Sequence, residues 1–160
     1  MEIYILRHGI AEAAGAGMAD ADRALTVEGE QKLRDVLRSA RKAKAEPALI
    51  LTSPLRRAVE TAAIAADVLG TNKGPVRTDA LAPDSTPERI WQEIRANRSA
   101  GALLLAGHEP LLGQLLGYLL GCPTLEVDFK KGALARIDID HFTGEPRGVL
   151  KWLLVPKLAS

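Results

Sequence analysis

The stretch Met1-Glu-Ile-Tyr-Ile-Leu-Arg7-His8-Gly9 decides the fold, because it places a short buried strand directly before three residues suited to chemistry. Residues 3–6 are apolar and mostly β-formers, a pattern typical of a strand covered on both faces in a parallel sheet. In open α/β sheets, ligands bind just beyond the carboxyl ends of the strands. A cation, an imidazole and a glycine at that place predict a site for an anion together with a nucleophile or base.

The rest of the chain alternates between strand and helix patterns. Further strands are predicted at 48–52, 76–78, 102–106, 133–139 and 149–155. Helices are predicted to begin at Thr26, at Ser53 as N-cap with Pro54 in the first helical position, at Thr86 and at Pro110. This order predicts an α/β fold, a three-layer sandwich with a mostly parallel central sheet flanked by helices and an antiparallel C-terminal edge hairpin.

Length and charge limit the classes of protein that fit. A chain of 160 residues is expected to form a single domain over 1–160. Its 21 basic and 20 acidic residues leave a net charge of +1, which argues against general nucleic-acid or membrane-surface binding. The apolar stretch 102–120 is interrupted by His108-Glu109-Pro110, which favours a strand, a turn and a buried helix over a membrane span. With one cysteine, Cys122, and no signal peptide, the protein is expected to be cytoplasmic.

Three predicted strand ends share one arrangement of residues. They read Arg7-His8-Gly9, Ser53-Pro-Leu-Arg56-Arg57 and Gly107-His108-Glu109. Helix N-termini attract anions, and guanidinium groups grip phosphate oxygens in pairs. The pattern therefore predicts a phosphate pocket with two imidazoles. The residues expected to contact the substrate are Arg7, Gly9, Ser53, Glu109 and one of the adjacent arginines, Arg56 or Arg57.

These residues resemble the histidine phosphatase superfamily, also called phosphoglycerate mutase-like, and within it the small bacterial phosphohistidine phosphatases of the SixA type. The matching segments, in the family's order, are Leu6-Arg7-His8-Gly9, Leu25-Thr26-Val27-Glu28-Gly29, 53–62 and Gly107-His108. The resemblance implies that His8 is the phospho-acceptor and that Arg7, Arg57 and His108 complete the catalytic pocket. It selects Arg57 over its neighbour because the family's arginine directly precedes the alanine of Arg-Ala-x-x-Thr, so Arg56 is expected on the rim.

Two departures from the family pattern bear on the substrate. Larger members carry a glutamate proton donor after the third strand, where this chain reads Leu81-Ala-Pro-Asp84 with no glutamate until Glu88. The chain also lacks the long insertions with which the mutases enclose a small sugar phosphate. Both departures favour a site open to a protein over a mutase site. The proton donor stays open between Glu109, Asp84 and none, and a first-turn role is favoured for Glu109.

The chemistry expected is covalent and independent of metal. Neutral His8 attacks phosphorus in line, and water then hydrolyses the phosphoimidazole. Arg7, Arg57 and a protonated His108 stabilise the oxygens. The predicted function is removal of phosphate from protein phosphohistidine, without cofactor or metal. The alternatives are a phosphatase for small phosphomonoesters and a non-catalytic phospho-ligand binding module.

The remaining polar residues are assigned to solvent or turns. Glu12, Asp20 and Asp22 lie in an Ala- and Gly-rich loop and are expected to be solvated. The third histidine, His141, falls in a predicted turn with Gly144 and is given no catalytic role. The expected partners are a phosphohistidine-bearing protein or a small phosphorylated substrate, with no nucleic acid and no membrane.

Overall fold

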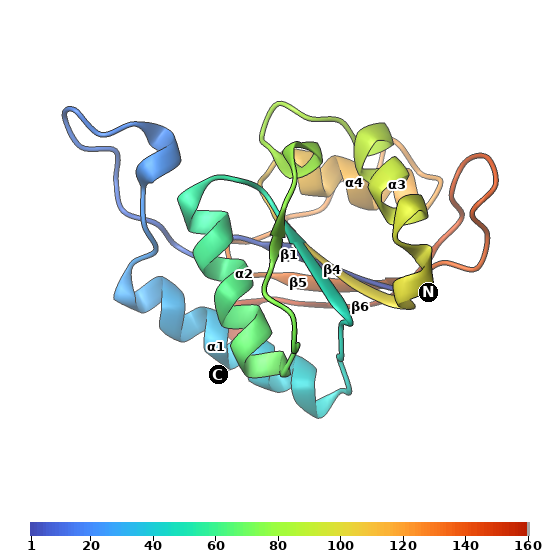
Figure 1. Cartoon of the computed structure of the whole chain (residues 1–160), viewed down its shortest axis with the longest axis horizontal. Helices are drawn as coiled ribbons and strands as arrows, with labels where there is room; N and C mark the ends of the chain where they lie inside the picture. The colour runs from blue at the N-terminus through green and yellow to red at the C-terminus, as the bar shows by residue number, and fades with distance from the viewer. Residues whose placement is uncertain (160) are drawn as a thin grey trace.

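A computed structural model describes residues 1–159 as one six-stranded sheet with helices on both faces (Figure 1). The strands are β1 (Glu2–Arg7), β2 (Leu49–Thr52), β3 (Val76–Arg77), β4 (Ala102–Gly107), β5 (Leu134–Asp138) and β6 (Val149–Leu154). The helices are α1 (Val27–Lys42), α2 (Arg56–Leu69), α3 (Pro87–Ala96), α4 (Leu111–Leu119) and the short α5 (Pro156–Ala159). Three 3-10 turns are η1 (Asp20–Asp22), η2 (Asp79–Leu81) and η3 (Arg98–Ala100).

The strand order confirms the predicted sheet. It runs β3-β2-β4-β1-β5-β6, with the first four strands parallel to one another. β5 is antiparallel to both β1 and β6, so the C-terminal pair forms the antiparallel edge. The architecture is therefore the predicted α/β sandwich with a mixed, mostly parallel sheet.

β1 lies inside the sheet and is buried on both faces, as its apolar run predicts. Ile3 and Ile5 belong to the core under α3 and α4, while Tyr4 and Leu6 belong to the core under α1 and α2. Figure 1 shows these two helix pairs on opposite faces of the sheet. Burial on both faces fixes the position of the strand, and hence the place where Arg7 leaves it.

Of the four predicted helix starts, three are confirmed, including Pro110 at the N-cap position of α4, and one is wrong. Thr26 and Thr86 are N-caps whose side chains accept backbone N–H groups of the first turn. Ser53 is not an N-cap, because α2 begins at Arg56 after Leu55, and Pro54 lies outside the helix. The Ser53 hydroxyl is held by other partners at the candidate site.

The apolar stretch 102–120 forms β4, a turn and α4, as predicted. No helix within residues 1–159 is long and apolar enough to cross a membrane.

Candidate active site

The sheet brings the three predicted strand ends side by side. Arg7 pairs with Gly107 across β1 and β4, and Thr52 pairs with Ala106 across β2 and β4. The His8 N–H then donates to the Gly107 carbonyl at 3.0 Å. These pairings set the two histidines next to each other, with ring centroids 5.1 Å apart.

His8 is a buried, neutral imidazole held in one orientation. Its Nδ1 lies 2.7 Å from the Gly9 carbonyl oxygen, which can only accept, so Nδ1 carries the proton and Nε2 keeps its lone pair. Burial lowers the pKa of His8 to about 4, and the charges of Arg57, Arg7 and Lys131 add to that shift. A base that is unprotonated at neutral pH, with a fixed tautomer, is suited to nucleophilic attack.

Gly9 fits this place because α1 passes close to it. A Cβ at Gly9 would lie 2.9 Å from the Leu33 side chain, and one at Gly29 would collide with the Ile10 carbonyl. The Gly9 N–H donates to the Thr61 hydroxyl at 3.2 Å. The structure thus commits both backbone groups of Gly9 to protein partners, and a direct contact of Gly9 with substrate stays a prediction.

His108 is held by Ser53. Its Nε2 lies 2.7 Å from the Ser53 hydroxyl oxygen, which also accepts the Leu55 N–H at 3.3 Å. The Leu55 N–H occupies one of the two lone pairs of the Ser53 hydroxyl, so the direction of the Ser53–His108 hydrogen bond depends on the His108 tautomer. Ser53 is fully buried, so the structure places it against His108.

The electrostatics of the chain alone favour a neutral His108, and the predicted protonated ring during phosphoryl transfer stays a prediction. Burial lowers its pKa to about 3, and the neighbouring His8, Arg57 and Arg7 lower it further than Asp20 raises it. Its Nδ1 is buried and has no hydrogen-bond partner within residues 1–159. A neutral ring with an Nδ1–H is still a hydrogen-bond donor.

Arg7 and Arg57 each present one unpaired donor near the histidine pair. Arg7 Nη1 donates to the Phe129 carbonyl at 2.7 Å, and Arg57 donates through Nη1 and Nη2 to Asp20. The Nε atoms of both arginines are buried without a partner in the part of the chain that the structure describes. Buried donors of this kind are costly unless a ligand satisfies them.

Asp20 is the residue that the sequence analysis missed. Its backbone carbonyl accepts Arg57 Nη1 at 3.0 Å, and its carboxylate accepts Nη2 at 3.1 Å. Burial raises the pKa of Asp20, but the Arg57 and Arg23 guanidiniums together outweigh it and lower the pKa below its usual value. Asp20 is exposed as predicted, with 63% of its side chain accessible, but its contact with Arg57 was not predicted.

Arg56, the neighbour of Arg57, lies on the exposed rim as predicted. The Arg56 side chain is 59% exposed and pairs with Glu60, whereas the Arg57 side chain is 7% exposed. Thr61, which accepts the Gly9 N–H, donates to the Arg57 carbonyl at 2.7 Å. Arg57 is thus the arginine of this pair that lies with the histidines.

The two carboxylates considered as proton donors differ in their surroundings. Glu109 follows His108 and accepts the Gly113 N–H in the first turn of α4. Burial raises its pKa, against the lowering effects of that hydrogen bond and of Arg7. Asp84 is exposed in the loop before α3. Glu109 lies just before α4 and not in its first turn as predicted, although its carboxylate accepts an N–H group of that turn.

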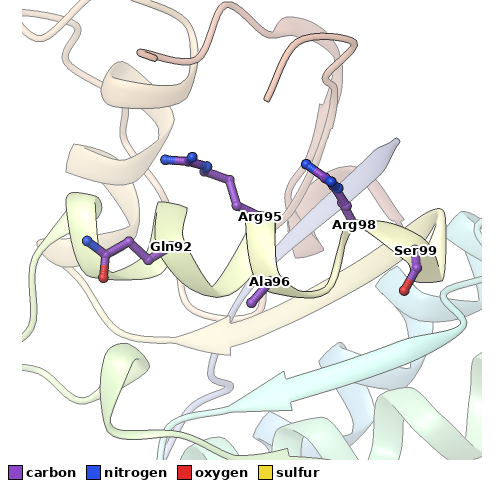
Figure 2. A pocket seen from close by; sticks show the side chains of 5 residues that line it. All are labelled: Gln92, Arg95, Ala96, Arg98 and Ser99. Carbon is purple, nitrogen blue, oxygen red and sulfur yellow. The ribbon is translucent and has the colours of Figure 1, made fainter. Parts of the chain in front are cut away.

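A separate hollow of about 580 Å³ lies along α3 and η3, before β4, and so at the other end of that strand from His108. Figure 2 shows Arg95 and Arg98 extending to one side there, with Ala96 and Ser99 on another. All of its lining residues are exposed and converge on no common point. Within residues 1–159, no three His, Cys, Asp or Glu side chains gather as a metal-binding group.

A buried pair of neutral histidines, ringed by arginine donors at the carboxyl edge of a parallel sheet, defines a phosphate-handling enzyme of the α/β class. Residues 3–81 match the histidine phosphatase superfamily (branch 1). An uncharacterised protein of Picosynechococcus is 38% identical over 117 residues, covering 71% of this chain and 70% of that protein. The chain belongs to the histidine phosphatase superfamily and is a phosphatase of that fold.

Solved structures place it near one branch of that superfamily. The protein histidine phosphatase SixA, in complex with tungstate, superposes with a TM-score of 0.86 at 28% identity over 98% of both chains. The SixA protein of Agrobacterium tumefaciens superposes with a TM-score of 0.83 at 25% identity over 97% of both chains.

Proposed function

We propose that this protein hydrolyses phosphohistidine on a protein substrate through a phospho-His8 intermediate, without a metal. The observation that carries the proposal is the oriented neutral His8 beside His108, with unpaired Nε donors of Arg7 and Arg57 around them. The structural likeness to SixA, described as a protein histidine phosphatase, supports the same substrate class. That SixA binds tungstate, an oxyanion, which supports the pocket as the place for phosphate.

The first step transfers phosphorus from one imidazole to another. The Nε2 lone pair of His8 attacks phosphorus as the substrate P–N bond breaks, and the bonding pair leaves on the substrate nitrogen, which takes up a proton. Water then attacks phospho-His8 and releases inorganic phosphate and free His8. Splitting the transfer into two displacements is covalent catalysis.

The pocket stabilises the transferring group with fixed donors. Arg7 and Arg57 each have an Nε–H free for equatorial oxygens, and His108 contributes Nδ1–H. Ser53 acts through His108 as a positioning residue, and Gly9 acts through His8. These donors are preorganised because each is bonded to the protein on its other side.

The leaving group decides between phosphohistidine and esters. The alcohol that forms from an alkoxide leaving group is about as weak an acid as water, so the alkoxide needs a proton donor in order to depart. The conjugate acid of an imidazole leaving group has a pKa of about 6.5, so imidazole departs readily. The carboxylates nearest the pocket are bonded to Arg57 or to the α4 backbone, which favours the easier leaving group.

The test compares kcat/KM on a phosphohistidine peptide with that on a phosphoserine peptide and a sugar phosphate. We expect a preference of at least ~10²-fold, the usual contribution of general acid catalysis to a difficult leaving group. Denaturing the enzyme at alkaline pH during turnover should trap phosphate on His8, and EDTA should leave the rate unchanged. His8→Ala, folded but inactive, is the control.

Equal efficiency on phosphohistidine and the esters would contradict the substrate assignment and support a phosphomonoesterase. Phosphate binding without turnover of any substrate would instead support a binding module.

A further inference from the structure

A second cleft, of about 700 Å³, opens beside the proposed phosphate pocket, and Arg7 lines it. Its walls come from the loop after β1, from α1, from the segment before β5 and from the end of β6 with α5. The charged residues that line it, besides Arg7, are Lys32, Lys130, Lys131, Lys157 and Asp128. Half-buried Ile10, Val155 and Pro156 form an apolar strip among them. We call this hollow the lysine cleft.

The lysine cleft concentrates positive charge on a chain that is nearly neutral overall. The net charge of the whole sequence is +1, yet four exposed lysines and one arginine line this single hollow. Lys130 pairs with Asp128 and Lys32 with Glu28, each at 2.8 Å. No ion pair forms at Lys131 or Lys157 within residues 1–159. The local excess therefore remains after the internal pairs are counted.

Hydrogen bonds fix one wall of the lysine cleft to the nucleophile. Phe129, directly before the two lysines, accepts Arg7 Nη1, and Gly132, directly after them, donates to the carbonyls of Arg7 and His8 at 3.2 and 3.1 Å. Residues 130–131 are thus held between two anchors on the strand end that carries the nucleophile. Lys131 is close enough for its charge to help lower the pKa of His8.

The type and exposure of the residues that line the lysine cleft indicate which class of ligand it binds. Lysine is a flexible, strongly hydrated point charge, suited to attracting carboxylates without fixed geometry. A tight site for a small polyanion would instead converge buried donors on one point, and these lysines are exposed and come from separate elements. Dispersed cations around an apolar strip match a protein surface with several carboxylates and an apolar side chain.

We propose that the lysine cleft docks an acidic face of the phosphorylated protein, so that carboxylates near its phosphohistidine meet Lys32, Lys130, Lys131 and Lys157. This inference rests on the proposed function and adds the chemistry of the partner surface. The attraction is long-ranged and acts mainly on the rate of association, which makes it sensitive to salt.

The experiment uses two synthetic peptides with the same phosphohistidine and a neighbouring leucine, one flanked by glutamates and the other by glutamines. The parent enzyme is expected to favour the glutamate peptide about tenfold in kcat/KM at low salt, and to lose the preference at 0.5 M NaCl. The double variant Lys32→Glu, Lys157→Glu is expected to abolish the preference and to keep the parent's kcat/KM on the glutamine peptide within about twofold.

The matched control is Lys42→Glu, Lys73→Glu, which makes the same change in net charge at exposed lysines that precede β2 and β3. It should keep most of the preference. A parent that hydrolyses both peptides equally, or a cleft variant no different from the control, would overturn the docking proposal alone. Micromolar inhibition by tripolyphosphate, with no preference between the peptides, would overturn it in favour of a small polyanion. No hydrolysis of either peptide would overturn the proposed function and this inference with it.

Discussion

Replacing Asp20 tests how Arg57, the arginine proposed to bind phosphate, is held in place. Asp20 binds both Nη atoms of Arg57, one through its backbone carbonyl and one through its carboxylate, and leaves Nε facing no protein partner. Arg23 braces the same carboxylate at 3.0 Å and reaches the Glu12 carbonyl at 3.0 Å. In Figure 1 this loop, between β1 and α1, extends from the body of the molecule with η1 near its base. Asp20→Ala removes the carboxylate contact and keeps the carbonyl contact.

The structure sets the size of the effect. A hydrogen bond between charged groups contributes about 1.5–3 kcal/mol when buried, and an exposed ion pair less than about 1. Asp20 is 63% exposed while Arg57 is 7% exposed, so we expect a loss of about 1 kcal/mol, or roughly fivefold in kcat/KM. The loss should fall on kcat, because a loosened guanidinium misplaces its donor at the transition state.

A second substitution separates positioning from charge. Asp20→Asn keeps an oxygen that can accept from Arg57 but removes a negative charge near the phosphate. It should therefore keep kcat near the parent value and lower the inhibition constant for vanadate. Steady-state kinetics and vanadate competition measure both quantities. Asp22→Ala, in the same exposed 3-10 turn, is the control. If Asp20→Ala equals or exceeds the parent in kcat, Asp20 is not a positioning residue.

Three further predictions concern Arg57, Ser53 and His8. Arg57→Ala should cost about 2–5 kcal/mol in kcat/KM, and Arg56→Ala little, as a buried contact outweighs a rim charge; equal losses would contradict the assignment. Ser53→Ala should lower kcat more than it raises KM, because the His108 ring loses its only partner on Nε2, and NMR of the ring nitrogens would show the change of tautomer. The third concerns stability in acid. His8 takes up a proton below about pH 6.5 in the unfolded chain but only below about pH 4 in the folded protein. The free energy of unfolding therefore falls by about 3 kcal/mol as the pH is lowered from 6.5 to 4. Urea titrations at pH 7 and pH 4.5 should show a smaller fall in His8→Ala, and an equal fall would contradict the lowered pKa.

The strand and helix that position the site could be predicted from local sequence patterns. The apolar run before Arg7 identified the central strand, and Thr26 showed where α1 begins. The parts that were mistaken depend on contacts between distant residues. Ser53 followed by Pro54 has the pattern of a helix start, and nothing nearby shows that its hydroxyl binds a histidine 55 positions away.

Asp20 was missed for a related reason. It lies 37 positions from Arg57, in a loop of small residues without periodicity. The only local signal is its spacing three residues before Arg23, which indicates a braced turn and says nothing of the arginine in α2. The protonation of His108 was also beyond sequence patterns, because it depends on how deeply the ring is buried among cations.

Because burial lowers the pKa values of His8 and His108, their protonation states are expected to differ between the free enzyme and its phosphate complex in the proposed reaction. In the free enzyme both rings are neutral, because burial and the arginine charges lower their pKa values to about 4 and about 3. A phosphoryl group brings negative charge against those same arginines, and negative charge raises the pKa of a nearby imidazole. His8 has its lone pair engaged with phosphorus, so the proton gained in the complex belongs on His108. A histidine protonated only when phosphate is bound is acid enough to assist a departing imidazole and far too weak to replace a carboxylic acid for an alkoxide. In the proposed mechanism, the electrostatics of the pocket therefore favour P–N over P–O cleavage, by an argument separate from the family resemblance.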